Sequence, residues 1–517
     1  MTPDAATRTP SRRAAALAGL AAGVGALGAG ELLAGILSGA ASPILAIGDL
    51  VISLQPPGAK QLVVDLFGEA DKLILNVVIG GVALAGAAGL GVLARTRPEL
   101  ARIGFAAAGL LALGAGLRDP LADALPTLIV AAAAVLVAIW LLGWLMGWAA
   151  VAEPARAEMP DWGRRRFIGS SVAVIGTAAV AGVFGRTLLV RGREASTPQA
   201  GAIPAASDTV PPLPDGVGFG VDGLSPIVTP NQDFYRIDTA LLVPRPDLDA
   251  WRLRVTGMVD RPLELTYDEL VALDLHEQYV TIACVSNEVG GHLVGNALWK
   301  GVRLKELLDR AGVHPDATQI VGRSADNFTA GFPTVWALDD DREALVAVEM
   351  NGAPLPAEHG FPARLIVPGL YGYVSATKWL TEIELTTLEG FDGYWIPLGW
   401  AKKAPVLTQS RIDVPRAGAG VQAGTVAVAG VAWAPDRGIA AVEVQVDESG
   451  WQAAELTTPI SDATWVQFLY RWDATPGDHQ LRVRATDGTG EVQTDRRTRP
   501  DPDGARGHHT IRVSVSG

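Results

Sequence analysis

The stretch Thr281–Gly291 reads TIACVSNEVGG and holds Cys284, the one cysteine among 517 residues. Apolar residues run into the cysteine and a turn-forming Gly-Gly pair follows it, which predicts a buried strand that ends near residue 285. A lone cysteine in such a place is most often a small buried apolar residue. The same residue type also serves as a nucleophile beside a histidine such as His292 or His359, as a redox sensor, or as a ligand of a soft metal. A sensor usually has a resolving cysteine, which this chain lacks, and the other readings stay open on this residue alone.

The sequence around this stretch predicts a mixed α+β domain over residues 231–403. Strand-like segments alternate with short helical ones, and the helical segment that begins at Tyr267 follows Thr266, a residue type that favours the helix cap position. The segment GVRLKELLDRAGV has apolar residues at helical spacing, and Gly312 near its end predicts where the helix stops. The predicted strands are 251–259, 278–285, 363–369 and 378–386.

The segments on either side of this domain differ in kind. Residues 194–230 hold seven prolines among Ala, Ser, Gly and Thr, which predicts an extended linker. Residues 404–517 consist of period-two segments separated by turn residues, and they predict an all-β sandwich of immunoglobulin type that lacks the cysteine pair. Its predicted strands lie at 425–434, 440–451, 465–472, 479–490 and 509–516.

Residues 1–193 predict a helical membrane domain. A helix that spans a bilayer needs about 20 largely apolar residues. Five segments meet or approach this length, at 14–37, 73–94, 103–117, 125–148 and 167–190. Glu31 lies in the first of them, where a carboxylate is either functional or packed near a helix end.

The charges beside these segments predict how the membrane domain is oriented. Arginines cluster at residues 12–13, 95–102 and 164–166, whereas the alternate loops carry acidic residues such as Asp49, Asp119 and Asp123. The positive-inside rule therefore places the N-terminus in the cytoplasm and, after five crossings, everything beyond Val190 outside. The expected localisation is the plasma membrane, with the polar half on its extracytoplasmic side.

The fifth segment begins with GRRRFIG at Gly163–Gly169, and its RRRFI core resembles a twin-arginine export signal. That pathway carries folded proteins, which suits a protein that receives a cofactor in the cytoplasm. The alternative is an ordinary cluster of positive residues that anchors the helix at the cytoplasmic face.

Charge and histidine content narrow the range of partners and cofactors. The first 195 residues carry 16 Lys and Arg against 13 Asp and Glu, and the remainder carries 26 against 42, so the polar half is acidic and we expect no nucleic-acid partner. All seven histidines lie at or beyond His276, which excludes a haem held by two histidines between the membrane helices. No haem, flavin or NAD motif is evident in the sequence.

Five segments of the polar half together resemble the sulfite oxidase family of molybdenum enzymes. Their order and spacing match that family across residues 231–388, and the C-terminal segment is similar to the family's appended, often dimerising, domain. The segments are FYR at Phe234–Arg236, TIACVSN at Thr281–Asn287, WKGVRLKELLDRAGV at Trp299–Val313, MNGAPLPAEHGFPARLIVPG at Met350–Gly369 and SATKW at Ser375–Trp379. The resemblance implies an oxidoreductase whose cofactor is molybdenum bound to molybdopterin.

The resemblance also implies roles for individual residues. Cys284 falls on the position of the metal ligand, and a thiolate beside the two sulfurs of a pterin dithiolene suits a soft metal. Arg236 falls on an arginine that lies against the cofactor near the substrate, which makes it the second predicted catalytic residue. The positions that hold the pterin and its phosphate are matched by His359, Arg364, Ser375 and Lys378. Gly369 and Gly372 would either let the backbone approach the cofactor closely or form a simple turn at the end of a strand, and the sequence alone favours the turn.

The chain departs from the family pattern near the substrate. Sulfite-oxidising members carry an arginine shortly after the cysteine, where this chain has Glu288 and Val289. Asp238 stands where they have a histidine, and the position of the substrate-site tyrosine falls near Tyr394 or Trp400. Because a carboxylate repels an anion, these departures favour a neutral substrate such as a sulfoxide over sulfite.

The sequence therefore predicts a membrane-anchored, multi-domain enzyme that transfers an oxygen atom, and with it two electrons, at molybdenum on the outer side of the membrane. The small-molecule substrate is a sulfoxide or another neutral oxide in the first hypothesis, and sulfite in the alternative. Electrons pass to or from a separate carrier, a quinone or a cytochrome, and the C-terminal domain favours a homodimer. The first four membrane segments either dock that carrier or only anchor the enzyme in the lipid bilayer.

Two further alternatives stay open. The chain could be a non-catalytic surface receptor that displays a degenerate molybdenum domain, because the substrate arginine is absent. His292 and Asn296, on the segment after the cysteine, either line the entrance to the site or are ordinary loop residues.

Overall fold

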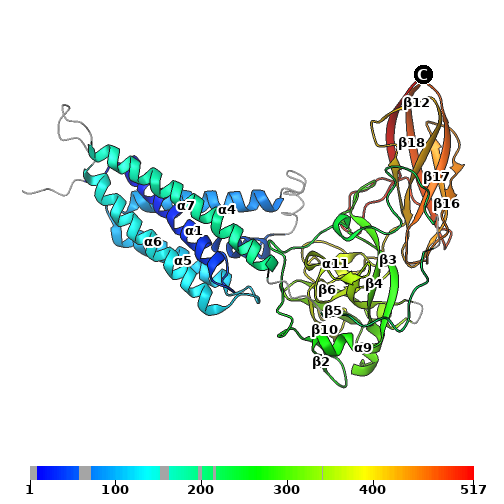
Figure 1. Cartoon of the computed structure of the whole chain (residues 1–517), viewed down its shortest axis with the longest axis horizontal. Helices are drawn as coiled ribbons and strands as arrows, with labels where there is room; N and C mark the ends of the chain where they lie inside the picture. The colour runs from blue at the N-terminus through cyan, green and yellow to red at the C-terminus, as the bar shows by residue number, and fades with distance from the viewer. Residues whose placement is uncertain (1–8, 57–70, 152–161, 196–200, 214–216, 340–341) are drawn as a thin grey trace, which may run out of the picture. The chain divides into compact units, whose positions relative to one another are not determined.

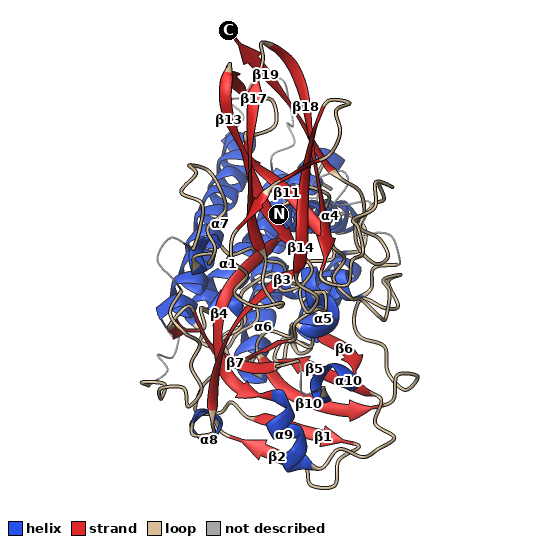
Figure 2. Ribbon diagram, turned by 90° about the vertical axis from the view of Figure 1, so that its right-hand side faces the viewer, coloured by secondary structure: helices blue, strands red, loops and turns tan. Residues whose placement is uncertain are grey.

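The structure is a computed structural model that describes all residues except 1–8, 57–70, 152–161, 196–200, 214–216 and 340–341. The chain divides into two compact units. The first comprises residues 1–197 with 240–242, and the second comprises 198–239 with 243–517. Helices make up the first unit and strands dominate the second (Figures 1 and 2).

The described part of the first unit consists of helices: α1 (Arg12–Ile36), α2 (Pro43–Ser53), α4 (Asp71–Leu93), α5 (Pro98–Gly116), α6 (Ala124–Val151) and α7 (Trp162–Ala195). Five of them, all but α2, are long and apolar enough to cross a membrane. The five predicted segments are therefore helical, as expected. The third begins at Pro98 rather than at residue 103, because a proline fits the first turn of a helix, where its missing N–H is not needed.

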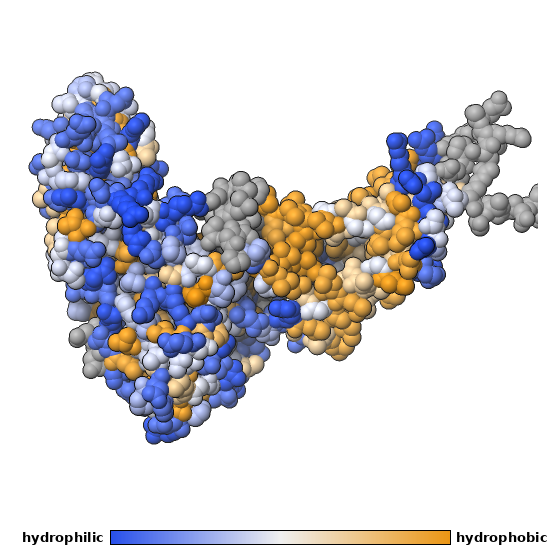
Figure 3. Space-filling view, turned by 180° about the vertical axis from the view of Figure 1, so that it is seen from behind, coloured by the Kyte–Doolittle hydropathy of each residue, from blue (hydrophilic) through white to orange (hydrophobic). Residues whose placement is uncertain are grey.

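Helix α1 packs against α4, α6 and α7 through small residues. A Cβ added at Gly28 would lie 2.3 Å from the carbonyl oxygen of Ala178 in α7, and one added at Gly19 would lie 2.2 Å from that of Ala87 in α4. Backbones this close leave no room for a side chain, a packing mode typical of membrane helices. The face drawn in Figure 3 is largely hydrophobic over the helices of this unit.

Glu31 is buried in α1 and contacts the start of α2. Its carboxylate accepts hydrogen bonds from Ser42 Oγ at 2.6 Å and from the Ile44 N–H at 3.3 Å, and Arg186 of α7 lies 3.9 Å away. These hydrogen bonds satisfy the Ser42 O–H and the Ile44 N–H at the beginning of α2. The contacts favour the packed alternative for Glu31 over a functional one.

Two sheets form the part of the second unit between residues 253 and 386. In the first sheet, β3 (Leu275–Ala283), β4 (Val294–Arg303), β7 (Leu345–Met350) and β8 (Ala353–Pro354) follow one another, and β9 (Arg364–Ile366) pairs with β7. In the second, the order is β2 (Leu263–Leu265), β1 (Leu253–Gly257), β10 (Leu380–Thr386), β5 (Gln319–Ser324) and β6 (Thr329–Pro333). Only the β1–β10 pairing is parallel.

Short helices connect these strands: α8 (Tyr267–Val271), α9 (Leu304–Ala311), α10 (Val335–Leu338) and α11 (Gly372–Ser375). The predicted cap is confirmed, since Thr266 and Glu269 form a reciprocal capping box at the start of α8. The predicted end of α9 is confirmed too, because Gly312 adopts a φ of +70° that favours glycine. The apolar faces of the strands and of α9 meet in one core that contains Leu253, Leu307 and Ile383.

Two further sheets make up residues 404–517. One contains β11 (Gln409–Val414), β13 (Gly424–Trp433), β17 (Val466–Ala474) and β16 (Glu455–Leu456). The other contains β12 (Gly420–Gln422), β19 (His509–Ser516), β18 (Gly477–Asp487), β14 (Ile439–Val446) and β15 (Gln452–Ala453). Residues from both sheets, including Val428, Phe468, Val444 and Ile511, share an apolar core. An all-β segment with the predicted strands is therefore present, whereas its immunoglobulin type stays a prediction.

Residues 194–195 of the predicted linker still belong to α7, and its described residues from 201 on pack along the second unit. The Ser207 N–H donates to the carbonyl of Leu275 in β3, the Phe219 N–H donates to Gln467 of β17, and the Thr229 N–H donates to the carbonyl of Asn296 in β4. These hydrogen bonds tie the segment to two sheets. Within the predicted range 194–230, residues 196–200 and 214–216 lie outside the described residues.

Candidate active site

A cavity opens where the ends of several strands meet in the second unit. Its walls come from segments that are far apart in the sequence, near residues 234–239, 282–284, 324–328, 359–364 and 372–379, and from Trp395. Cys284, His359, Arg364 and Lys378 all lie in this wall. The structure therefore brings together four of the six residues that the sequence predicted for the site.

Cys284 follows directly after β3, and a folded-back loop holds its backbone. Its N–H donates to the carbonyl of Leu293 at 2.9 Å, and its own carbonyl accepts the N–H of Asn287 at 3.1 Å. The Asn287 side chain in turn accepts the N–H of Leu293 at 2.8 Å. The loop thus closes on itself, and the cysteine, 8% exposed, faces the cavity.

Arg364 is a buried cation, only 4% exposed, at the start of β9. One of its terminal N–H groups donates to the carbonyl of His359 at 3.0 Å, and its guanidinium lies 5.0 Å from the centre of the Trp299 ring. The buried Nε of Arg364 has no hydrogen-bond partner in the part of the chain that the structure describes. Burial lowers the pKa of Arg364 to about 10, so the group still carries its charge at neutral pH.

His359 lies beside Arg364 and is neutral. Its Nε2 is 2.9 Å from the carbonyl oxygen of Asn231, which can only accept, so Nε2 carries the proton and Nδ1 is left as an acceptor. Burial lowers the pKa of His359 to about 4, and the positive charges of Arg364 and Lys378 act in the same direction.

Lys378, Asp238 and Arg236 form a chain of ion pairs at the edge of the cavity. Lys378 Nζ and Arg236 Nε each lie 2.9 Å from the same oxygen, Oδ2 of Asp238. The Asp238 side chain is 4% exposed and that of Arg236 is 40% exposed. Burial lowers the pKa of Lys378 to about 8, opposed by the Asp238 carboxylate. Asp238, which departs from the family pattern, therefore contacts both cations.

Ser375 and the two predicted glycines take different places. The Ser375 hydroxyl donates to the carbonyl of Tyr371 at 3.0 Å, so it stabilises the turn behind the cavity wall. Gly372 does line the cavity. Gly369 does not: a Cβ there would lie 2.7 Å from atoms of Trp336 and Asp436, so the close approach is to protein, which agrees with the turn alternative.

Three residues considered for the entrance or the substrate side lie outside the cavity wall. Glu288 and His292 are exposed and do not belong to the cavity wall. Asn296 is buried in β4, where it bonds to Thr281 and to the carbonyl of Ile227. The negative charge in the cavity comes instead from Asp238 and Asp326, because the loop after the cysteine turns away from the site.

The cavity wall also contains residues that sequence reasoning missed: Tyr235, Asp326, Phe328, Tyr373 and Trp395. Burial raises the pKa of Asp326, and the Asp238 charge adds to this effect. Burial likewise raises the pKa of the Tyr235 and Tyr373 hydroxyls, so both keep their protons at neutral pH. Tyr235 lies inside one family-like segment and Tyr373 lies between two of them, so the sequence did contain a signal that these residues are near the site. Trp395, rather than Tyr394 or Trp400, is the aromatic residue of its segment that reaches the cavity.

The cavity fits a pterin cofactor that carries metal-binding sulfurs and a phosphate. The one thiol of the chain lies in the same wall as two buried cations, Arg364 and Lys378. The buried Arg364 Nε lacks a protein partner among the described residues, and a polar group in that situation requires a ligand or water. These features match the donors that a phosphate and a soft metal need.

Comparisons with known proteins agree with this geometry. The profile of the family described as "Oxidoreductase molybdopterin binding domain" matches residues 240–395. The mitochondrial sulfite oxidase of Rattus norvegicus is 32% identical over 273 residues, which are 44% of this chain and 49% of that protein. An uncharacterized oxidoreductase of Bacillus subtilis, YuiH, is 36% identical over 151 residues, which are 29% of this chain and 71% of that protein.

The chain belongs to the sulfite oxidase family of molybdopterin oxidoreductases. It is therefore an oxidoreductase, and the cofactor of the family, molybdenum bound to molybdopterin, is its cofactor. The alternative of a non-catalytic receptor is accordingly set aside. The chain spans about half the length of the mitochondrial sulfite oxidases that it matches, 49% for the rat protein.

A solved structure shares the fold of the second unit. The sulfane dehydrogenase SoxCD from Paracoccus pantotrophus aligns with a TM-score of 0.50 at 23% identity, over 56% of this chain and 82% of that one. This similarity extends beyond the family profile and indicates a common architecture. It carries no information about the substrate of the present chain.

Proposed function

We propose that this family member transfers an oxygen atom, with two electrons, to or from a small neutral substrate such as a sulfoxide, and that Cys284 is the protein ligand of the metal. The bound cofactor supplies the two-electron, oxygen-accepting chemistry. The position of Cys284 in the cavity wall supports its role, because the chain has no other thiol. Arg364 and Lys378 would hold the phosphate, with His359 and the turn around Ser375 beside the pterin.

The ion-pair arrangement at Asp238 carries the proposal of a neutral substrate. Both Arg236 and Lys378 contact the Asp238 carboxylate, whose negative charge offsets part of their attraction for a substrate anion. A carboxylate in a partly buried wall also repels an anion more strongly than one in water, because the effective dielectric constant is lower. A substrate without net charge avoids this cost.

The remaining wall suits an apolar, proton-consuming reaction. Phe328, Trp395 and Ile237 contribute apolar surface that excludes water from the reacting groups. Removing oxygen from a sulfoxide yields a sulfide and water and consumes two protons and two electrons. Tyr373 holds its proton in the cavity wall, since burial raises the pKa of its hydroxyl, and burial also raises the pKa of Asp326 in the same wall. Arg236 would orient the substrate at the edge.

The test compares two substrates on the purified full-length protein. Reduction of an uncharged aryl methyl sulfoxide by a reduced viologen dye is measured beside oxidation of sulfite by ferricyanide. We expect kcat/KM for the sulfoxide to exceed that for sulfite by at least about tenfold, equal to about 1.4 kcal/mol of transition-state binding. A sulfite value equal to or above the sulfoxide value would reject the neutral-substrate proposal.

Sulfite oxidation is the second candidate. The relatives that the chain matches include mitochondrial sulfite oxidases. In this case Arg236 and Lys378 would have to exchange Asp238 for the substrate anion. The same pair of assays decides between the two candidates.

We further propose a plasma-membrane location with the second unit on the extracytoplasmic side. The five long apolar helices and the arginines before them support it. Arg166 lies 5.4 Å from the centre of the Trp148 ring, and tryptophan with arginine is typical of the cytoplasmic interface of a membrane helix. The RRRFI motif, in the first turns of α7, would then direct export, and a quinone or a cytochrome would exchange electrons with the enzyme.

A homodimer through residues 404–517, with an immunoglobulin-type arrangement, completes the proposal. Two sheets that share one apolar core support the arrangement. Light scattering of the purified protein with and without this segment tests the dimer, and a mass of one chain for the full-length protein would reject it.

A further inference from the structure

The C-terminal segment contacts the polypeptide on both sides of Cys284. Ahead of the cysteine, the Thr281 N–H donates to the carbonyl of Ala463 at 2.9 Å, and the Trp465 N–H donates to Thr281 Oγ1 at 2.8 Å. After the cysteine, Arg411 of β11 donates to the carbonyl of Gly291 at 2.8 Å. The metal-binding position therefore lies between two attachments to the all-β segment.

Arg411 joins three separate parts of the chain. Besides Gly291, its guanidinium contacts Asp413 Oδ1 at 2.6 Å and Ser225 Oγ at 2.8 Å, and the Ser225 N–H donates to the other oxygen of Asp413 at 3.1 Å. Arg411 is 9% exposed, so these hydrogen bonds are shielded from water. A planar guanidinium serves three partners in fixed directions, which a lysine cannot do.

The loop held by Arg411 is the one that fixes the cysteine backbone. Gly291 lies two residues before Leu293, whose carbonyl accepts the Cys284 N–H. The neighbouring Gly290 adopts a φ of +82° and packs against His509 of β19, where an added Cβ would lie 2.2 Å from the ring. The loop is thus pressed onto the C-terminal segment by packing as well as by the Arg411 hydrogen bond.

We propose that Arg411 is a positioning residue of the molybdenum site, which sets the orientation of the Cys284 thiolate through the Gly291 loop. The proposal rests on the assignment of Cys284 as the metal ligand. The all-β segment would then help to set the geometry of the active site, because Arg411 in β11 holds the loop that follows Cys284.

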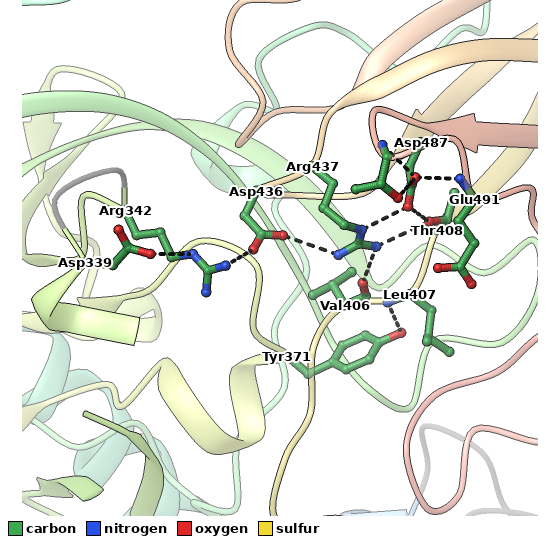
Figure 4. Close-up of polar contacts among 11 residues, drawn as sticks. Asp339, Arg342, Tyr371, Val406, Leu407, Thr408, Asp436, Arg437, Asp487 and Glu491 are labelled. Carbon is green, nitrogen blue, oxygen red and sulfur yellow. Dashed lines mark hydrogen bonds and ion pairs between the residues drawn. The ribbon is translucent and has the colours of Figure 1, made fainter. Parts of the chain in front are cut away.

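A second arginine provides a matched control. Arg437 donates to Asp487, Asp436, Val406 and Thr408, and Asp436 also pairs with Arg342 at 3.0 Å (Figure 4). The Val406 N–H donates to the carbonyl of Gly369, and the Leu407 N–H donates to the Tyr371 hydroxyl at 3.4 Å. Arg437 therefore holds together the part of the all-β segment that contacts residues 369–371, and it makes no hydrogen bond to the cysteine loop in the described residues.

The experiment uses Cys284 as its own probe, because no other thiol exists in the chain. Full-length wild type, Arg411→Lys, Arg411→Ala and Arg437→Ala are purified in detergent from cells that cannot make molybdopterin, and the rate of maleimide labelling is measured. We expect both Arg411 variants to label at least about tenfold faster than wild type, since one charge-assisted hydrogen bond no longer holds the loop. Arg437→Ala should stay within about twofold of wild type.

Two outcomes would overturn the proposal: unchanged labelling in Arg411→Lys, or equal acceleration in Arg437→Ala, which would indicate general loosening. Arg411→Lys keeps the charge beside Asp413 and guards against a variant that fails to fold. In cofactor-loaded protein, the electron paramagnetic resonance signal of the one-electron-reduced metal should change in Arg411→Lys and not in Arg437→Ala. If wild type purified from cells that make molybdopterin lacks molybdenum, or if its signal is the same in Cys284→Ser, the assignment of Cys284 as the metal ligand fails. The labelling rates still show whether Arg411 holds the Gly291 loop.

Discussion

The cofactor side and the substrate side of the cavity differ in how well their residues match those that the family resemblance implies. On the cofactor side, Cys284, Arg364 and His359, which the family resemblance assigned to the cofactor, all line the cavity. On the substrate side, the family arginine after the cysteine is missing and Asp238 bonds to both nearby cations. The residues expected to hold the cofactor are therefore in place, whereas the charges on the substrate side differ from those that the family resemblance implies.

The largest effect expected from breaking the cofactor side is that of Cys284→Ser. A hydroxyl is a harder and more weakly donating ligand than a thiolate, so the metal would lose its soft protein ligand. We expect the sulfoxide or sulfite activity of the loaded enzyme to fall at least about a thousandfold, roughly 4 kcal/mol. Steady-state kinetics beside a metal analysis measures this, and a variant that retains a tenth of the wild-type activity would contradict the assignment.

The next largest effect is expected from Arg364→Met on cofactor retention. The variant keeps apolar volume beside Trp299 but removes the buried charge that would face a phosphate. We expect the affinity for the cofactor to fall about a hundredfold. Pterin fluorescence after oxidation of the purified protein reports occupancy. Arg323→Met, which removes a half-buried partner of Glu384 in the same domain, should retain wild-type occupancy.

Two histidines make the stability of the folded protein depend on pH. The pKa of His359 and that of His509 are each lowered by burial from 6.5 to about 4. Above pH 6.5 both histidines are mostly neutral in the folded chain and in the unfolded chain. Between pH 6.5 and 4 they bind protons in the unfolded chain but not in the folded chain, so stability is lost as the pH falls. We expect a loss of about 2 kcal/mol for each histidine between pH 7 and pH 5 in the cofactor-free protein.

Thermal unfolding followed by tryptophan fluorescence in detergent measures this loss. In His509→Asn the side chain can still accept the Ile412 N–H, which His509 Nδ1 accepts at 3.0 Å, but no longer titrates. The pH slope of this variant should be about half that of wild type. An unchanged slope would show that His509 is not the group responsible.

The smallest effect, about tenfold, is expected from Asp238→Asn. Removing the carboxylate charge releases Arg236 and Lys378 to attract an anion, so KM for sulfite should fall about tenfold while that for a neutral sulfoxide changes little. Asp392→Asn is the matched control, because that carboxylate pairs with Lys402 and does not line the cavity. Equal changes in the two variants would contradict a specific role for Asp238.

Local patterns predicted the elements well. The capping box at Thr266, the end of α9 at Gly312 and the period-two strands after residue 404 are set by neighbours in sequence, so they could be read without a structure. Tyr235, Asp326 and Trp395 could not be placed in the cavity in this way, because an aromatic residue or a turn carboxylate looks the same whether it faces a cavity or solvent. Glu288 shows the converse error, since its closeness to Cys284 in sequence suggested the substrate and the loop directs it outward.

The sequence by itself determined the apolar helices, the order of helical, mixed and all-β segments, and the family, since these depend on periodicity and on residues in a recognisable order. Only the tertiary structure decided that Asp238 contacts both Arg236 and Lys378, and that Arg411 reaches the loop of Cys284 across 120 residues of chain. The reason is physical: helix and strand formation depend on near neighbours, whereas charge pairing and loop position depend on distances that folding alone creates.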